Sequence, residues 1–531
     1  MMPSSLAVQR LTLTVACLAQ GMMVLDVLIV SVALPAIQHE LRLSPSGLEW
    51  IVSAYALALA ALIPAGGALG DHFGRKRIFI AGVAIFTLAS VGCALSGSGG
   101  MLIGFRVVQG VGGAVMSSLT LALISEAYPP ESRSGPIGLW AAVSGLAVAG
   151  GSVIGGLLLS VFPWSSIFWV NVPLGVLTIA ICAVAVRESR RPGGTQLDVP
   201  GVALSAAGLF LLTFGFVDSA DATWRSPLVG VCIAVGIVVL ALFIVRERRA
   251  ASPMVPKALI RTASFGRACT AYLLAYLAFA GFIYYVTLFF QNIERWSALR
   301  TGLSWLFFCI PYFVVAQLRH RLERWLPVAA AVGAGCLIAA AGTAGMSQLT
   351  TATPFAWPAI CYVLVGVGFA LMVPASSAAA MAEVPAGSSG IGSGLFNAAR
   401  QVGTAMGLAI LGSIATAVIL ADWHSEARSL TLAAQGHAQH LGPAVAGGQA
   451  HLAAAVLGAS ELDPAVSAFM RGFEVALLIA AAILVVAASI GYFGLRHLAA
   501  PTARGQLVDA QESRGDVARP RAQSGCGACP V

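Results

Sequence analysis

Two ionisable residues, Asp26 and Arg106, stand inside long apolar stretches of this 531-residue chain. Asp26 lies eight residues before the end of the stretch 11–34, and Arg106 lies five residues into the stretch 101–127. If both stretches are membrane helices, a rise of about 1.5 Å per residue puts these side chains about 12 and 8 Å below the same membrane face. Each charge costs about 2.5 to 3.5 kcal/mol there, so we expect the two residues to be paired or functional.

A carboxyl beside a guanidinium in hydrocarbon surroundings can act as a proton carrier. The cation favours the ionised form of Asp26, whereas removal from water favours the neutral form. This balance can place proton exchange near neutral pH. The alternative is a static polar contact with no proton traffic, and the two residues alone do not decide between these readings.

Arg400 is a further ionisable residue inside an apolar stretch. It belongs to the polar segment 397–403 of a stretch that otherwise contains small and apolar residues. We therefore predict that Arg400 faces the protein interior.

A glycine-rich and basic string lies between the second and third apolar stretches. Its glycines permit a tight turn and close helix approach, and its charged residues can pair across an interface that opens and closes, so we predict a conformational latch. The alternative is that positive charge here only fixes the topology. The residues of this predicted latch are Gly67, Gly70, Asp71, Gly74, Arg75, Lys76 and Arg77.

The composition sets the class of protein that must position these residues. Hydrophobic residues make up 58% of the chain, charged residues 10%, and the mean hydropathy is +0.87. This leaves too little polar surface for a water-soluble protein of this size. The apolar runs are continuous rather than alternating, which excludes a β-barrel and predicts an all-α polytopic membrane protein.

Fourteen apolar segments are each about long enough to cross a bilayer as a helix. The seventh and eighth look like an inserted pair. The predicted spans are 11–34, 48–70, 78–97, 101–127, 137–160, 166–186, 200–218, 227–245, 268–290, 302–318, 327–346, 356–381, 390–421 and 472–495.

The distribution of positive charge predicts the orientation. Most of the 30 Lys and Arg residues fall on one side of the predicted spans, which places both termini in the cytoplasm of a cell whose plasma (inner) membrane holds the protein. The net charge of +8 then reflects topology and contact with anionic lipid, and no nucleic-acid partner is needed.

Two segments outside the spans are predicted to be non-membrane. Residues 422–471 form an outer loop that has room for short amphipathic helices, and residues 497–531 form a disordered cytoplasmic tail. The histidines of the outer loop fit no standard zinc spacing, so we predict no metal site. Cys526 and Cys529 form a CxxC string in the tail, which is weak evidence for metal binding or redox chemistry.

Several strings, in order along the whole chain, resemble the major facilitator superfamily and in particular its fourteen-helix drug:proton antiporters of the EmrB/QacA type. The predicted latch is similar to the signature loop of the superfamily. Segment 25–35 resembles the first-helix signature of the fourteen-helix branch, and segment 106–113, which contains Gln109, resembles the fourth-helix motif. Further matches are Trp164, Ile167, Phe168, Asn171, Pro173, Asp198, Gly201, Phe289, Gln291, Ser297, Gly302, Asn397, Arg400, Gln401, Gly403 and Gly407.

The resemblance implies a secondary transporter that works by alternating access. Two six-helix bundles, 1–190 and 263–496, would enclose a central cavity, with residues 191–262 as two inserted linker helices. The family typically exports small amphipathic, often cationic, drugs, antibiotics or toxic compounds against inward proton flow. Asp26, Arg106, Gln109 and Arg400 would then serve proton coupling or substrate binding, the proton gradient would replace any cofactor, and the protein would be a monomer with an accessory export partner as an alternative.

The fifth span departs from the family pattern. The antiporter motif there has Gly-Pro followed by Gly-Gly, whereas this chain has Ser152 in place of the proline. Gly151, Gly155 and Gly156 remain and predict close packing or bending of this helix. Because proline is what forces a kink, an importer or facilitator of a small metabolite stays open as an alternative.

A polytopic membrane enzyme is a more distant alternative. Such an enzyme would need a histidine and a carboxylate at helical spacing near one membrane face, and the sequence shows none. The chain also lacks a GxxxxGK[ST] loop, so ATP would not drive transport by this chain.

Overall fold

The computed structural model describes residues 5–129, 134–189, 198–222, 226–250, 262–322, 326–382, 384, 389–427 and 432–497. Every regular element in these ranges is a helix, which confirms the all-α prediction. The predicted tail lies outside the described residues from 498 onward, together with Cys526 and Cys529.

Thirteen helical spans of the described part are long and apolar enough to cross a membrane. The helix α5 occupies the one remaining predicted span, so the structure is compatible with fourteen crossings. The elements are α1 (Ser5–Leu41), α2 (Pro45–Phe73), α3 (Arg75–Ala94), α4 (Gly99–Ala127), α5 (Ser134–Val161), α6 (Ser166–Trp169), α7 (Asn171–Ala185), α8 (Val199–Ala222), α9 (Pro227–Arg249), α11 (Ala263–Leu288), the π-helical turn η2 (Phe289–Ile293), α12 (Ala298–Ser304), α13 (Leu306–Leu322), α14 (Val328–Ser347), α15 (Ala356–Met381), α16 (Ser389–Ala427), α17 (Leu432–Ala446), α18 (Ala450–Leu457), η3 (Ala459–Glu461) and α19 (Leu462–Leu495).

Most of the predicted outer loop over 422–471 is helical. α16 and α19 extend into this segment from both sides, and α17 and α18 fill much of the rest. Trp423 is completely buried and donates its indole hydrogen to the Ala438 carbonyl at 2.8 Å, which fixes α17 against α16. Hydropathy marks where an apolar run ends, but a helix continues through polar residues wherever it can pack.

Two predicted spans are each built from two helices. The sixth is α6 followed by α7, and the tenth is α12 followed by α13, which together run past both predicted limits of 302–318. Ser297 caps the start of α12, because its hydroxyl accepts a hydrogen bond from the Arg300 amide at 3.2 Å. This N-cap lies just before the first residue of α12, Ala298, which explains why the helix starts earlier than the apolar run does.

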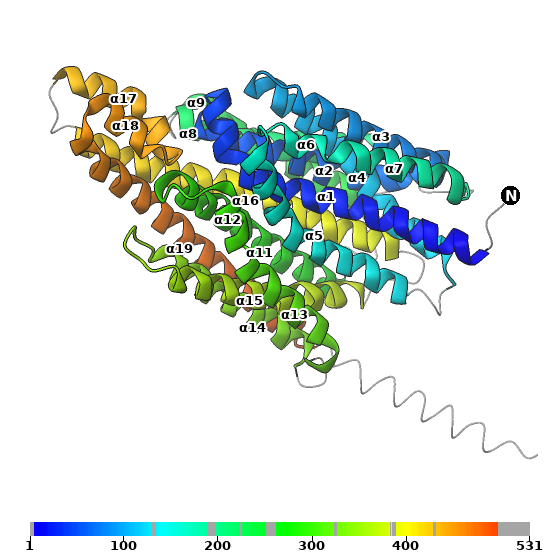
Figure 1. Cartoon of the computed structure of the whole chain (residues 1–531). Helices are drawn as coiled ribbons and strands as arrows, with labels where there is room; N and C mark the ends of the chain where they lie inside the picture. Colours follow the sequence, from blue (N-terminus) through cyan, green and yellow to red (C-terminus); the bar gives the residue numbers. More distant parts are fainter. Residues whose placement is uncertain are drawn as a thin grey trace, which may run out of the picture.

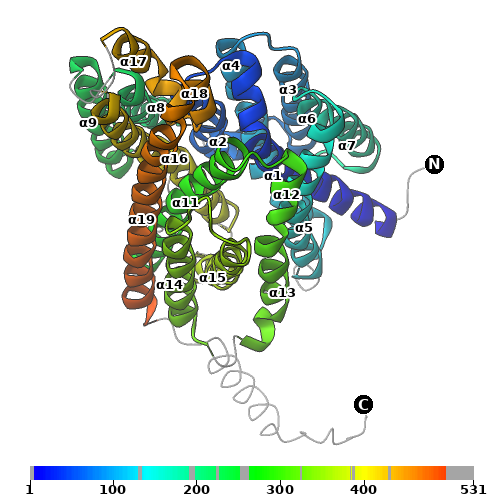
Figure 2. The ribbon, with the colours of Figure 1, turned by 60° about the vertical axis from the view of Figure 1, so that its left-hand side comes forward.

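The helices form two halves, α1–α7 and α11–α19, as Figures 1 and 2 show. α1 begins and α19 ends at the same end of the bundle, here called the terminal end. α17 and α18 lie at the opposite end, here called the loop end. α8 packs on α9, on α2 of the first half and on α16 of the second, so the inserted pair lies against the line where the halves meet.

The two halves are joined at the loop end by direct hydrogen bonds. Gln291 of η2 donates to the Val32 carbonyl of α1 at 2.9 Å. Its neighbour Asn292 donates to the side-chain oxygen of Gln38, also on α1, at 3.3 Å. We call this contact region the loop-end seam.

Candidate functional site

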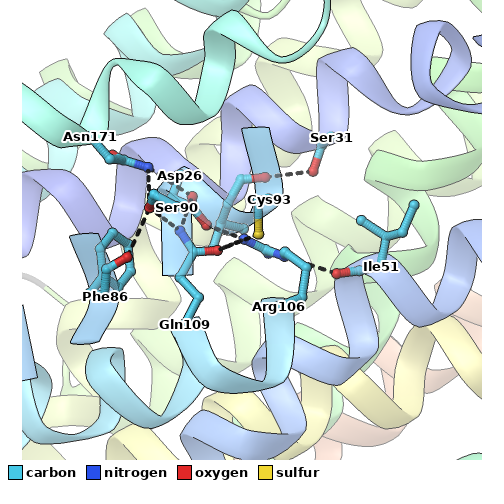
Figure 3. Close-up of polar contacts among 10 residues, drawn as sticks. Asp26, Ser31, Ile51, Phe86, Ser90, Cys93, Arg106, Gln109 and Asn171 are labelled. Carbon is cyan, nitrogen blue, oxygen red and sulfur yellow. Dashed lines mark hydrogen bonds and ion pairs between the residues drawn. The ribbon is translucent and has the colours of Figure 1, made fainter. Parts of the chain in front are cut away.

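Asp26 lies at the centre of a buried polar network in the first half (Figure 3). One carboxylate oxygen accepts a hydrogen bond from Arg106 Nη1 at 2.5 Å, which is also an ion pair. The other accepts from Gln109 Nε2 at 2.8 Å and from Asn171 Nδ2 at 3.1 Å. Asp26 and Arg106 are each 1% exposed, so water does not screen this pair.

The guanidinium of Arg106 has acceptors besides the carboxylate. Its Nε donates to the Ile51 carbonyl at 3.0 Å, and its Nη1 also donates to Gln109 Oε1 at 2.7 Å. The Tyr55 ring lies below the guanidinium, with 4.4 Å between the Cζ atom and the ring centroid. α1, α2 and α4 therefore converge on one charge, and the cation–π contact adds to the ion pair.

Two more residues complete the network, and sequence reasoning did not place either of them there. Ser90 of α3 accepts from Gln109 at 2.8 Å, and its own hydroxyl donates to the Phe86 carbonyl. Asn171, noted only as a match to the family pattern, begins α7 and reaches Asp26. A polar residue inside an apolar run was the one available signal for Ser90, and such serines often bond only their own helix.

Glu49 is another buried carboxylate that sequence reasoning did not single out. It is fully buried on α2, and its side chain faces Gly412 of α16 across the two halves. A Cβ at Gly412 would lie 2.0 Å from Glu49 Oε1, so the glycine provides the room for this side chain.

A central cavity lies between the halves next to this network. The space measures about 1040 Å³, including the part that opens to solvent, and helices of both halves line it. Arg106 and Tyr55 reach its wall, whereas Asp26 and Gln109 lie behind them. Arg400 also lines the cavity, from α16 of the second half, so the structure does not bring it into the Asp26 network. Its placement agrees with the predicted interior orientation.

The predicted latch residues connect α2, α3, α4 and the end of α7, all in the first half. Arg75 pairs with Glu126 at 3.3 Å, and Arg77 pairs with Glu188 at 3.5 Å. Gly74 joins α2 to α3 with a φ of 112°, a conformation that favours glycine. That this loop acts as a latch between the two halves stays a prediction, since the ion pairs named here lie within one half.

Three further contacts at the same loop involve its other members. Lys76 Nζ donates to the Ala183 carbonyl at 2.6 Å. Gly70 faces Leu119 of α4, where a Cβ would lie 2.4 Å from a side-chain carbon, and the Gly67 Cβ position lies beside Ser118 at 3.9 Å. The side chain of Asp71 lies outside what the structure describes.

The three glycines of α5 lie at helix contacts. Gly151 faces Leu28, and Gly155 faces Ile29, both on α1. Gly156 instead faces α12 of the second half, where an added Cβ would lie 2.7 Å from both the Leu299 Cα and the Ala298 carbonyl oxygen. Gly156 is thus part of the loop-end seam.

The whole-chain comparisons agree with this architecture. The Major Facilitator Superfamily profile matches residues 16–408, which is well over half of the chain. The chain belongs to the major facilitator superfamily. It is therefore a multi-pass membrane protein of a transporter family and not an enzyme, which confirms the resemblance seen in the sequence and rejects the enzyme alternative.

Curated relatives in this superfamily carry names that refer to resistance. The chain is 30% identical to the tetracenomycin C resistance and export protein of Streptomyces glaucescens, over 91% of both chains. It is 33% identical to the multidrug resistance protein Stp of Mycobacterium tuberculosis, over 78% of this chain and 77% of that one.

A solved structure shows the same fold at low sequence identity. A bacterial homologue of the human lysosomal transporter Spinster, in an inward-facing and unoccupied conformation, superposes with a TM-score of 0.61. It is 18% identical and is matched over 92% of this chain and 97% of its own.

Proposed function

We propose that this protein exports small amphipathic organic compounds, such as antibiotics, in exchange for protons that enter the cell. The resistance and export functions named for its relatives support this direction of transport. The protein would lie in the plasma membrane with both termini in the cytoplasm, and a monomer would be the transporting unit. Alternating access would open the central cavity first to one side and then to the other.

The Asp26 network is the observation that carries the proton-coupled part of the proposal. It places one carboxylate directly behind the cavity wall, held by three donors from two other helices, α4 and α7. A proton on Asp26 would weaken its attraction to Arg106, which lines the cavity, and so would change the surface that the substrate meets. Proton binding and substrate binding would thereby be linked through one side chain.

Everted membrane vesicles test the direction and the energy source together. With the vesicle interior made acidic, we expect tetracenomycin C to accumulate inside, and we expect nigericin, which collapses the pH gradient, to stop the accumulation. Vesicles without the protein are the control. Accumulation only in right-side-out vesicles would contradict the proposal and favour the importer alternative.

The loop-end seam provides a second prediction, because alternating access requires it to close. Gly156→Val would place a branched side chain against the backbone of α12, and overpacking of this kind costs about 1 to 3 kcal/mol. We expect the equilibrium constant between the conformations with the seam closed and open to shift roughly tenfold to hundredfold toward the open one. Transport into vesicles should fall by a matching factor at equal membrane abundance.

Gly150→Val is the matched control for this substitution. Among the side chains that the structure describes, a Cβ at Gly150 meets Ile154 of its own helix, at 3.7 Å, and no other. We expect this variant to transport as the unmodified protein does. Equal losses in the two variants would show that α5 tolerates no valine, rather than that the seam must close.

A further inference from the structure

The charge of the central cavity indicates which substrates it accepts. Among the described residues that line it, two are cationic, Arg106 and Arg400, and none is acidic. We propose that the cavity binds aromatic acids, whose anionic group is held by Arg400 and whose rings pack on the aromatic wall of the second half. This inference rests on the proposed function and names its substrate class.

Arg400 is the cation left without a counter-charge. Its Nε donates to Asn397 Oδ1 at 3.0 Å, one turn back on α16, but its side chain makes no ion pair with another described residue. Arg106, by contrast, is neutralised by Asp26. The cavity thus carries about one net positive charge from these side chains, and it is centred on Arg400.

The position of Arg400 makes an anionic ligand favourable. The residue lies 11 positions into α16, about 17 Å along the helix from the terminal end. The guanidinium is partly buried and faces the cavity rather than lipid, so its remaining N–H groups can make charge-assisted hydrogen bonds to a carboxylate or sulfonate that enters there. A cationic ligand would instead add to the repulsion.

An aromatic wall begins directly beside this guanidinium. The Cζ atom of Arg400 is 5.6 Å from the Tyr276 ring centroid. From there the rings continue through Phe279 and Phe369, with centroids 4.5 Å apart, and on to Phe308, 5.3 Å from Phe279. All four rings line the cavity. A flat ligand can stack on this wall while its acidic group reaches Arg400.

The same geometry separates the substrate charge from the proton site. Asp26 does not line the cavity, because Arg106 and Tyr55 lie between. Export of a singly charged anion in exchange for one entering proton would move two positive charges inward. An inside-negative membrane potential would therefore drive this exchange even without a pH gradient.

Two dyes that share a three-ring xanthene scaffold test the inference directly. Fluorescein is anionic at mildly alkaline pH, and rhodamine 123 is cationic. Fluorescence anisotropy with the purified full-length protein in detergent would measure the affinity for each. We expect fluorescein to bind at least tenfold more tightly, and we expect Arg400→Gln to weaken it roughly tenfold to hundredfold, as loss of a charged hydrogen bond does.

Two further variants separate recognition from folding. Arg400→Lys keeps the positive charge and is expected to retain a preference for fluorescein. Arg248→Gln removes an exposed arginine near the end of α9 that does not line the cavity, and it is expected to change neither affinity. Size-exclusion profiles of all variants would establish that each is folded.

Several results would overturn the inference. One is that rhodamine 123 binds as tightly as fluorescein or more tightly, and another is that neither dye binds. The third is that the Arg400→Gln variant binds fluorescein as tightly as the unmodified protein does. These outcomes concern binding alone. If tetracenomycin C or a cationic dye still accumulates in everted vesicles in a proton-dependent way, the proposed function stands. Conversely, tight fluorescein binding without any proton-dependent transport would contradict the function but support the ligand class.

Discussion

Replacing Asp26 with Asn is expected to abolish proton-coupled export while the protein still reaches the membrane. Asparagine has nearly the same size, and its side-chain oxygen can still accept the hydrogen bond from Arg106. It cannot exchange a proton at any accessible pH. We expect transport driven by a pH gradient in everted vesicles to fall by roughly a hundredfold, equivalent to about 3 kcal/mol, and cells that express the variant to lose resistance to at least one exported compound.

The control for this loss is Asp463→Asn. Asp463 is exposed in the first turn of α19, so its substitution removes a carboxylate that lies outside the network. It should leave transport unchanged at equal abundance. If Asp26→Asn transported as well as this control, the carboxyl would be a static contact, which is the alternative left open by the sequence.

The sequence alone predicted the helices well, because lipid imposes a simple rule. A chain that crosses a bilayer must satisfy its backbone within each helix, so long apolar runs can be read directly as spans. The rule fails where the chain leaves lipid. Residues 422–471 contain polar and small residues, for which hydropathy allows short helices but does not place them. The structure has α17 and α18 packed there, with Trp423 bonded to α17.

The centre of the site was also within reach of the sequence. Charge is rare in apolar runs, which marks Asp26 and Arg106 as unusual, and helix rise predicts similar depths for the two. Depth says nothing about rotation around the helix axis. Only the packing of α3 and α7 could show that Ser90 and Asn171 complete the network.

For Arg400, the sequence predicted the orientation of the side chain but not its neighbours. Its interior orientation followed from the cost of an exposed charge in lipid, but its partner did not. The resemblance grouped it with Asp26, whereas the structure puts it in the other half, against Tyr276. A substrate class inferred from the family, often cationic, therefore differs from the one that the charges of this cavity favour.

Arg106→Gln is expected to cause the largest loss of stability among the site variants. It removes the cation from a carboxylate that is 1% exposed, and breaking a buried ion pair in this way costs about 3 to 5 kcal/mol. Gln109 and Asn171 would still donate to Asp26, but neither neutralises its charge. Thermal unfolding in detergent, followed with a thiol-reactive dye that detects exposure of the buried Cys93 and Cys182, would measure the loss.

The double variant Asp26→Asn with Arg106→Gln separates the ion pair from packing. It leaves no buried charge at this position, so it should unfold at a higher temperature than Arg106→Gln alone, although Asp26→Asn by itself leaves the Arg106 cation unpaired and is expected to lower the unfolding temperature. This reversal of sign is what a double-mutant cycle shows when two groups interact directly. Simple addition of the two single effects would mean that the pair contributes little, and that the helices are held together by their apolar contacts instead. Such a pair could then be broken by a proton at small cost, which would make Asp26 an easier carrier but a weaker link to the cavity wall.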